Sequence, residues 1–209
     1  LSVPAGAQET RLKDLVNIRG VRSNHLIGFG LVVGLTGSGD SKKSLATNRA
    51  TANMLTRLGL NTGSAEVAGG NVAAVIATVS LPAFSRIGDK LDIKVSTIGD
   101  AKSLAGGTLL LTPLKAGDSN IYIVAQGSVV VGQANGQGPR VLTVARVPSG
   151  GMVEREFVPE IAPTGRISLS LKMPDFTTAS RIGDSINRRF KGFFAIAKDV
   201  STVDVVVPP

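Results

Sequence analysis

The chain has 209 residues, of which 43% are hydrophobic and 4% aromatic, with 25 glycines and no cysteine. This length allows one or two domains with a buried core, and the lack of cysteine excludes disulfides and thiolate metal sites. The formal net charge is +8, and residues 9–58 hold eight Lys or Arg against three Asp or Glu. This basic region indicates an acidic partner or a solvated surface. No apolar run reaches the roughly 18 residues of a membrane-spanning helix, so none is expected.

The first seven residues, LSVPAGA, end in Ala5-Gly6-Ala7, the A-x-A pattern of a signal-peptidase site. We interpret residues 1–8 as a signal-peptide remnant or a disordered start, and we expect the protein to be exported. Residues 9–24 are mostly polar, with four apolar positions that could pack, at Leu12, Leu15, Val16 and Ile18.

Residues 25–35 form an apolar run that glycines interrupt, which is typical of a strand with a bulge or a close backbone approach. The Gly-Ser-Gly-Asp turn at residues 37–40 ends this run. Residues 44–58 predict a helix that Gly59 stops, with apolar residues on one face at Leu45, Ala52, Leu55 and Leu58.

Four further strands are predicted, at residues 72–81, 91–98, 108–114 and 121–131. The first is almost entirely apolar, as in a strand covered on both faces, whereas residues 90–95 alternate as in a half-buried strand. Residues 132–151 are rich in Gly, Gln and Asn and predict a long flexible arm that holds one short strand at 141–147.

The last part of the chain predicts a compact β-α-β unit. Strands are expected at residues 166–172 and 203–207, with a possible extra strand at 153–158. Between them, a helix starts at Pro174-Asp175 and turns five apolar residues to one face, Phe176, Ala179, Ile182, Ile186 and Phe190. The expected fold class is α+β: a glycine-rich mixed-sheet domain with one helix at 9–150, followed by a smaller β-α-β domain at 152–208.

Common catalytic and cofactor patterns are absent from the sequence. The glycines at residues 28–39 match neither G-x-x-x-x-G-K-[ST] nor G-x-G-x-x-G, so a nucleotide loop is disfavoured. His25 is the single histidine, and it has no G-x-S-x-G partner for a triad and no thiolates with which to bind zinc. The one Tyr and seven Phe leave few stacking platforms for nucleic acid, despite a basic pI near 10.2.

Glu154 and Glu156 are the exception, because paired carboxylates can cleave a glycosidic bond by acid/base chemistry. Their spacing places both on one side of the strand expected at 153–158. The same spacing is typical of a solvated strand face, so both interpretations remain open.

Motifs in a fixed order from residue 11 to residue 207 carry a family resemblance. The main ones are RLKDLV from Arg11, LIGFGLVVGL from Leu26, GSGD from Gly37, NVAAV from Asn71 and GDAKSL from Gly99. In these motifs the chain resembles the flagellar P-ring protein family. Phe29 stands where that family more often has Tyr. The family's chains continue beyond Pro209, so we interpret this chain as part of a longer protein.

The resemblance implies a non-enzymatic structural subunit of the flagellar basal-body P ring in the periplasm, with no cofactor. Many copies would close into a ring around the rod, as part of its bushing. The partners it implies are further copies of the chain, the flagellar rod, the L-ring protein, peptidoglycan and a periplasmic P-ring chaperone. The alternative is a periplasmic protein that binds or cleaves peptidoglycan through Glu154 and Glu156.

Two sets of site residues follow. Exposed basic side chains are expected to contact the acidic rod or wall, at Arg11, Lys13, Lys42, Lys43 and Lys102. Seven glycines are expected to serve turns and close backbone packing, at Gly28, Gly30, Gly34, Gly37, Gly39, Gly106 and Gly107.

Overall fold

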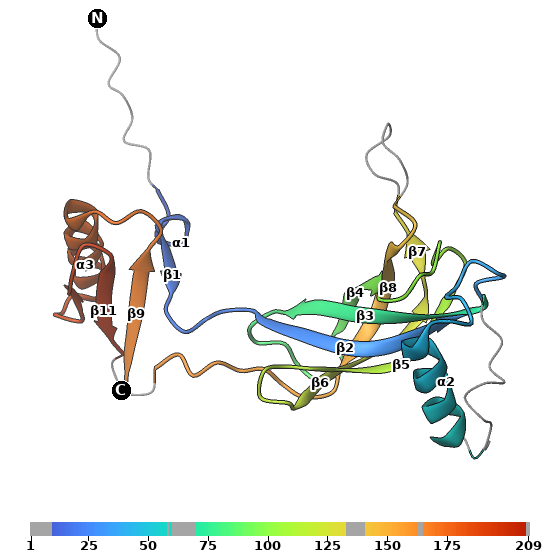
Figure 1. Ribbon diagram of the computed structural model, residues 1–209. Helices are drawn as coiled ribbons and strands as arrows, with labels where there is room; N and C mark the ends of the chain where they lie inside the picture. The colour runs from blue at the N-terminus through green and yellow to red at the C-terminus, as the bar shows by residue number, and fades with distance from the viewer. Residues whose placement is uncertain (1–9, 58, 60–69, 133–140, 163–164, 208–209) are drawn as a thin grey trace, which may run out of the picture. The chain divides into compact units, whose positions relative to one another are not determined.

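The computed structural model describes residues 10–57, 59, 70–132, 141–162 and 165–207 (Figure 1). The chain divides into two compact units, each with its own hydrophobic core. The larger unit is Ser23–Val158, and the smaller one combines Leu1–Arg22 with Pro159–Pro209. The signal-peptide remnant predicted at residues 1–8 lies outside the described residues.

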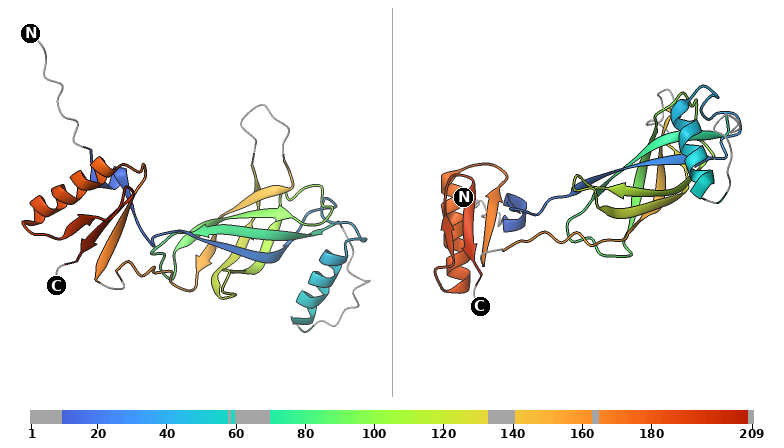
Figure 2. Two further views of the ribbon diagram at one scale, coloured as in Figure 1. Left: turned by 60° about the vertical axis from the view of Figure 1, so that its left-hand side comes forward. Right: turned by 60° about the horizontal axis from the view of Figure 1, so that its bottom comes forward.

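The larger unit is a closed antiparallel barrel of six strands (Figure 2). The strands pair in the order β4-β3-β2-β5-β6-β8, and β8 pairs back with β4 to close the barrel, while β7 adds a short edge to β8. Their bounds are β2 Asn24–Val33, β3 Val72–Leu81, β4 Lys90–Thr97, β5 Thr108–Lys115, β6 Ile121–Ser128, β7 Val130–Val131 and β8 Val144–Val153.

Inward-facing aliphatic side chains fill the core of the barrel. Side chains such as Val32, Val75 and Ile93 are fully buried inside the barrel. At Gly28 a Cβ would collide with the carbonyl oxygen of Pro113, and the same addition at Gly30 would collide with the Thr112 hydroxyl. The register between β2 and β5 also shifts in this region. The close approach and the bulge predicted for residues 25–35 are therefore confirmed.

One helix, α2 (Leu45–Arg57), lies against the barrel, close to its predicted bounds. The predicted apolar face is wrong at its start, because Leu45 is 68% exposed. The helix instead buries Thr47 and Thr51, since the Thr47 hydroxyl donates to the Asp40 carboxylate inside the fold. The side chain of Leu58 lies outside the described residues.

The smaller unit is a four-stranded antiparallel sheet in the order β1-β9-β11-β10, with α3 packed on it. Its core includes Val16, Leu169, Ile182 and Val203. The elements are α1 Leu12–Leu15, β1 Val16–Ile18, β9 Arg166–Leu171, α3 Phe176–Phe190, β10 Ala195–Ala197 and β11 Thr202–Val206. The predicted buried face of α3 is confirmed in its middle, at Ala179, Ile182 and Ile186, whereas Phe176 and Phe190 are exposed.

The combination of helices and sheets agrees with the predicted α+β class, but the predicted mixed sheet does not occur. All pairings between the described strands are antiparallel. The expected β-α-β order exists as β9-α3-β10, yet β9 lies beside β11, which runs antiparallel to it. None of the helices in the described ranges is long and apolar enough to cross a membrane.

The unit boundaries also differ from the predicted ones. A division near residue 150 would cut β8, where Gly151 pairs with Leu91 of β4 and with Ala125 of β6. Residues 144–151 therefore belong to the barrel rather than to a flexible arm, and residues 133–140 of that arm lie outside the described part. At the other end of the chain, β1 pairs with β9, so the amino-terminal segment belongs with the smaller unit.

Candidate assembly surfaces

Asp40 is a fully buried carboxyl group at the end of the Gly-Ser-Gly-Asp turn. Its Oδ1 accepts the Ala101 N–H at 2.7 Å, and its Oδ2 accepts the Ala74 N–H at 2.8 Å and the Thr47 hydroxyl. The side chain thus joins the turn to β3, α2 and the loop after β4. A Cβ at Gly99 would collide with this carboxyl group. The sequence patterns do not predict that Asp40 joins these segments. Its position directly after Gly37-Ser-Gly is the one feature that indicates a special role.

This centre brings three of the predicted contact residues onto two neighbouring loops. Ser38 accepts the Lys102 N–H at its carbonyl, at 2.8 Å, and donates its hydroxyl to the Ser103 carbonyl at 3.0 Å. The N–H of Ser41, which precedes Lys42 and Lys43, donates to Asp100 Oδ1 at 2.8 Å. All three lysines are exposed. The loops that carry them are held together by these hydrogen bonds, each of which involves a backbone group.

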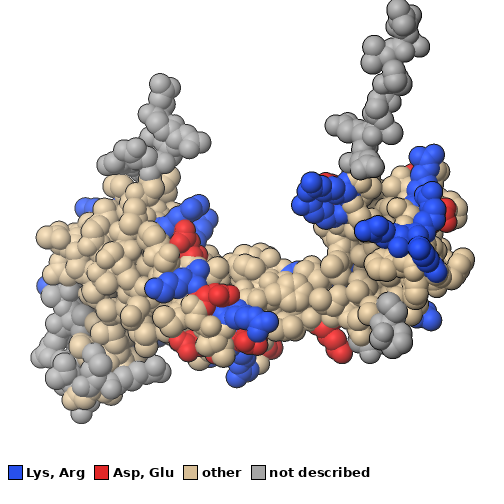
Figure 3. All heavy atoms as spheres, turned by 180° about the vertical axis from the view of Figure 1, so that it is seen from behind, with Lys and Arg blue, Asp and Glu red and all other residues tan. Residues whose placement is uncertain are grey.

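Arg11 and Lys13 are also exposed, but they belong to the smaller unit. The five predicted residues therefore do not form one cluster within either unit. On the face shown in Figure 3, the basic and acidic side chains of the larger unit lie next to one another in one region and form no single basic patch.

The remaining predicted glycines lie in turns or against neighbouring chain. Gly34, Gly37 and Gly106 have positive φ angles. A Cβ at Gly39 would collide with Val72, and one at Gly107 would collide with the Val32 side chain.

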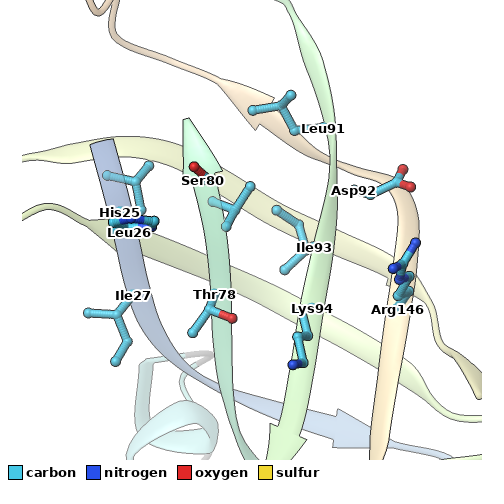
Figure 4. A pocket seen from close by; sticks show the side chains of 11 residues that line it. His25, Leu26, Ile27, Thr78, Ser80, Leu91, Asp92, Ile93, Lys94 and Arg146 are labelled. Carbon is cyan, nitrogen blue, oxygen red and sulfur yellow. The ribbon is translucent and has the colours of Figure 1, made fainter. Parts of the chain in front are cut away.

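A hollow of about 700 Å³ opens over β2, β3, β4 and β8 (Figure 4). It forms because the β3–β4 register ends at the Thr78–Lys94 pair, although β3 continues to Leu81 and β4 begins at Lys90. Lys94 lies directly opposite Arg146 in the β4–β8 register. Like charges in such positions destabilise a sheet, so this wall favours an anionic group nearby.

His25, Ser80 and Asp92 also line this hollow, but they do not form a catalytic triad. His25 and Ser80 are cross-strand neighbours, whereas Asp92 lies across the hollow on β4 (Figure 4). The Asp92 carboxylate accepts the Ser149 N–H at 2.8 Å instead of orienting the imidazole. These side chains can form polar contacts with a group in the hollow. The hydrogen bonds required for nucleophilic catalysis are not in place.

Glu154 and Glu156 do not share one side of a strand, so that prediction is wrong. β8 ends at Val153, and the Glu154 N–H donates to the Tyr122 carbonyl at 2.8 Å. Glu156 Oε1 lies 3.9 Å from Arg86 Nη1, in an exposed ion pair. Within the described ranges, no group of three or more His, Cys, Asp or Glu could hold a metal ion.

Comparison with known families shows to which family the chain belongs. The family model described as the flagellar P-ring protein matches residues 11–209. The chain belongs to this family. The flagellar P-ring protein of Syntrophotalea carbinolica is 47% identical over 98% of the chain, and that of Geobacter metallireducens is 45% identical over 100%. The Bdellovibrio bacteriovorus relative is 45% identical over 99%. The chain spans 57–61% of the length of these three P-ring proteins.

Proposed function

We propose that this chain is part of a structural subunit of the flagellar basal-body P ring in the periplasm, which assembles with further copies into a ring around the rod. Family membership over residues 11–209 carries this proposal. The fold supports it, because a closed barrel with a packed core is a stiff frame for surfaces that must repeat around a ring. No contact of Glu154 or Glu156 favours the peptidoglycan-cleaving alternative.

Lys42, Lys43 and Lys102 are the proposed contact with an acidic rod or wall surface, and Arg11 and Lys13 are a second contact from the smaller unit. One exposed ion pair contributes only about 0–1 kcal/mol. Repetition around a closed ring adds these small contributions by multivalency, which would hold the ring coaxial with the rod. The L-ring protein, peptidoglycan and a P-ring chaperone remain proposed partners, to which no contact surface is assigned.

The test exchanges Lys42, Lys43 and Lys102 for Glu in the complete protein. All three side chains are exposed, so we expect an unchanged thermal midpoint together with fewer P rings in isolated basal bodies and impaired motility. The matched control exchanges Arg19, Lys90 and Lys198 for Glu, which changes the charge equally at other exposed positions. Normal rings in the first variant would show that these lysines do not form the contact. Normal flagella without any ring of this protein would refute the proposed function.

A further inference from the structure

Three hollows lie in a row along the outward face of β2. The first, of about 700 Å³, is lined by His25 and Ile27, and the second, of about 450 Å³, by Ile27 and Phe29. The third, of about 290 Å³, is lined by Phe29 and Leu31. Neighbouring hollows share a lining residue, Ile27 or Phe29, and we call the three hollows together the β2 groove.

The floor and walls of the β2 groove are unusually apolar for the outside of a barrel. Ile27 is 55% exposed, Phe29 50% and Leu111 68%. Ile76 of β3 lies directly opposite Phe29, and Met54 of α2 lines the far end. Outward positions of antiparallel strands are normally polar, so a contiguous apolar strip of this kind marks an interaction surface.

The charges that line the β2 groove are mainly positive. Lys94 and Arg146 line the first hollow and Lys115 the second, while Asp92 is the carboxylate among the lining residues. The Asp92 carboxylate already accepts the Ser149 N–H. The groove therefore suits an apolar occupant that carries carboxylates.

A surface with exposed apolar and acidic side chains exists elsewhere on the same barrel. Phe84, Ile87 and Val158 are 45%, 64% and 59% exposed, and the segment between β8 and Val158 carries Glu154 and Glu156. We call these five residues the Phe84 surface.

Backbone contacts hold the Phe84 surface together. The Phe84 N–H donates to the Phe157 carbonyl at 2.9 Å, and the Phe157 N–H donates to the Ser85 carbonyl at 3.2 Å. The nearby cations have local partners: Arg86 pairs with Glu156, and the guanidinium of Arg155 lies 5.9 Å from the centre of the Tyr122 ring. Glu154 is then the carboxylate best placed to meet a cationic groove.

We infer that the β2 groove of one copy receives the Phe84 surface of a neighbouring copy. The inference rests on the proposed ring function and assigns the contact that would build the ring. Because the two surfaces differ, each contact leaves a free groove on one copy and a free Phe84 surface on the other. Such heterologous contacts propagate from copy to copy and close into a ring when the rotation between copies allows it. The carboxylates then have a structural role instead of a catalytic one.

Engineered disulfides test this contact directly, because these 209 residues hold no cysteine, and any cysteine in the rest of the complete protein is exchanged for Ser. The complete protein carries Phe29→Cys in the groove and Ile87→Cys in the Phe84 surface, and cells with assembled flagella are treated with a mild oxidant. We expect a ladder of dimers, trimers and higher species on a non-reducing gel. Cells that express the two single variants together are expected to give dimers only, since each copy then offers one reactive side. The matched control pairs Ile98→Cys, which is 43% exposed and lies outside the groove, with Ile87→Cys and is expected to give no ladder.

Several outcomes would overturn the inference. Dimers from Phe29→Cys alone would show a groove-to-groove contact, and a cross-link within one chain would show that the groove is filled by its own copy. Assembled P rings without any link between positions 29 and 87 would refute the inference and leave the proposed function standing. Flagella that lack rings of the unmodified protein would instead refute the proposed function.

Discussion

Asp40 determines how the exposed lysines are presented. Its carboxyl group accepts hydrogen bonds from residues that lie 7, 34 and 61 positions away in the chain. Two of these donors are backbone N–H groups, which would otherwise be buried without a partner. The loops with Lys42, Lys43 and Lys102 surround this carboxyl group, so the geometry of the proposed contact depends on a residue that never reaches the surface.

Replacing Asp40 with Asn should destabilise the barrel by about 2–4 kcal/mol, measured as the free energy of unfolding in urea. An amide has one oxygen acceptor, and its NH₂ group would face a backbone N–H of Ala74 or Ala101. The control is Asp100→Asn, because Asp100 is exposed and accepts from Ser41 at the surface. We expect a clearly smaller loss for the control. Equal stability of Asp40→Asn and the unmodified protein would show that these hydrogen bonds do not stabilise the fold.

At the scale of the element, α3 is the helix whose ends are best explained by the sequence. Asp175 caps its start, where Oδ2 accepts the Thr178 N–H at 2.7 Å, and Lys191 ends it in the left-handed conformation. Arg188 and Arg189 lie in the last turn, where cations complement the helix dipole. Hydrogen bonds from the Thr178 side chain and backbone hold the pKa of Asp175 below its usual value of 3.8.

This cap should make the smaller unit acid-sensitive. Because the folded-state pKa of Asp175 lies below the unfolded value, its stabilisation is complete above about pH 5 and is lost as the pH falls through the folded pKa. Asp175→Asn should cap nearly as well at pH 7 but lose less stability on acidification, since an amide does not titrate. Asp175→Ala should lower the thermal midpoint already at pH 7. Circular dichroism melts at pH 7 and pH 3 measure both effects, and parallel acid losses in all three proteins would contradict this role.

Local patterns in the sequence predict individual elements but not their partners. The apolar run at residues 72–81 and the alternation at 90–95 correctly predict β3 and β4. The pairing of β4 with β8 and of β1 with β9 joins distant residues, and alternation does not encode the partner strand. Gly150 and Gly151 end the stretch 132–151, for which the sequence predicts a flexible arm. In the fold, a Cβ at Gly151 would collide with the end of the Ile93 side chain, so this glycine leaves room for Ile93 in the core of the barrel.

The candidate surfaces could be predicted only in part. The exposure of Lys42, Lys43 and Lys102 follows from polar turns, and the structure confirms it. The β2 groove could not be foreseen, because Phe29 and Leu111 look like core residues until the strand register places them on the outside. Likewise, the buried face of α2 depends on the hydrogen bond that the Thr47 hydroxyl donates to Asp40. Helical periodicity of apolar residues does not predict this hydrogen bond.

At the scale of the whole molecule, the chain leaves the smaller unit at Arg22, builds the barrel and returns at Pro159. The backbone of residues 15–19 supports this division, since the Leu15 carbonyl accepts the Lys172 N–H at 2.9 Å and the Arg19 N–H donates to Ser168 at 2.8 Å. We propose that the two units are separate folding domains, because their buried cores share no residue.

Two fragments test this division. Residues 23–158 contain every strand of the barrel, so this fragment should fold and unfold cooperatively in urea, with the midpoint of the barrel in the intact chain. Residues 9–150 end before Gly151 and Val153, which pair β8 with β6, and they include β1 without β9. The barrel of this second fragment cannot close along its full length, and the fragment should show a broad transition at a clearly lower urea concentration. A cooperative transition of 9–150 at the midpoint of the intact chain would place the domain boundary at residue 150 and show that the last residues of β8 are dispensable for closure.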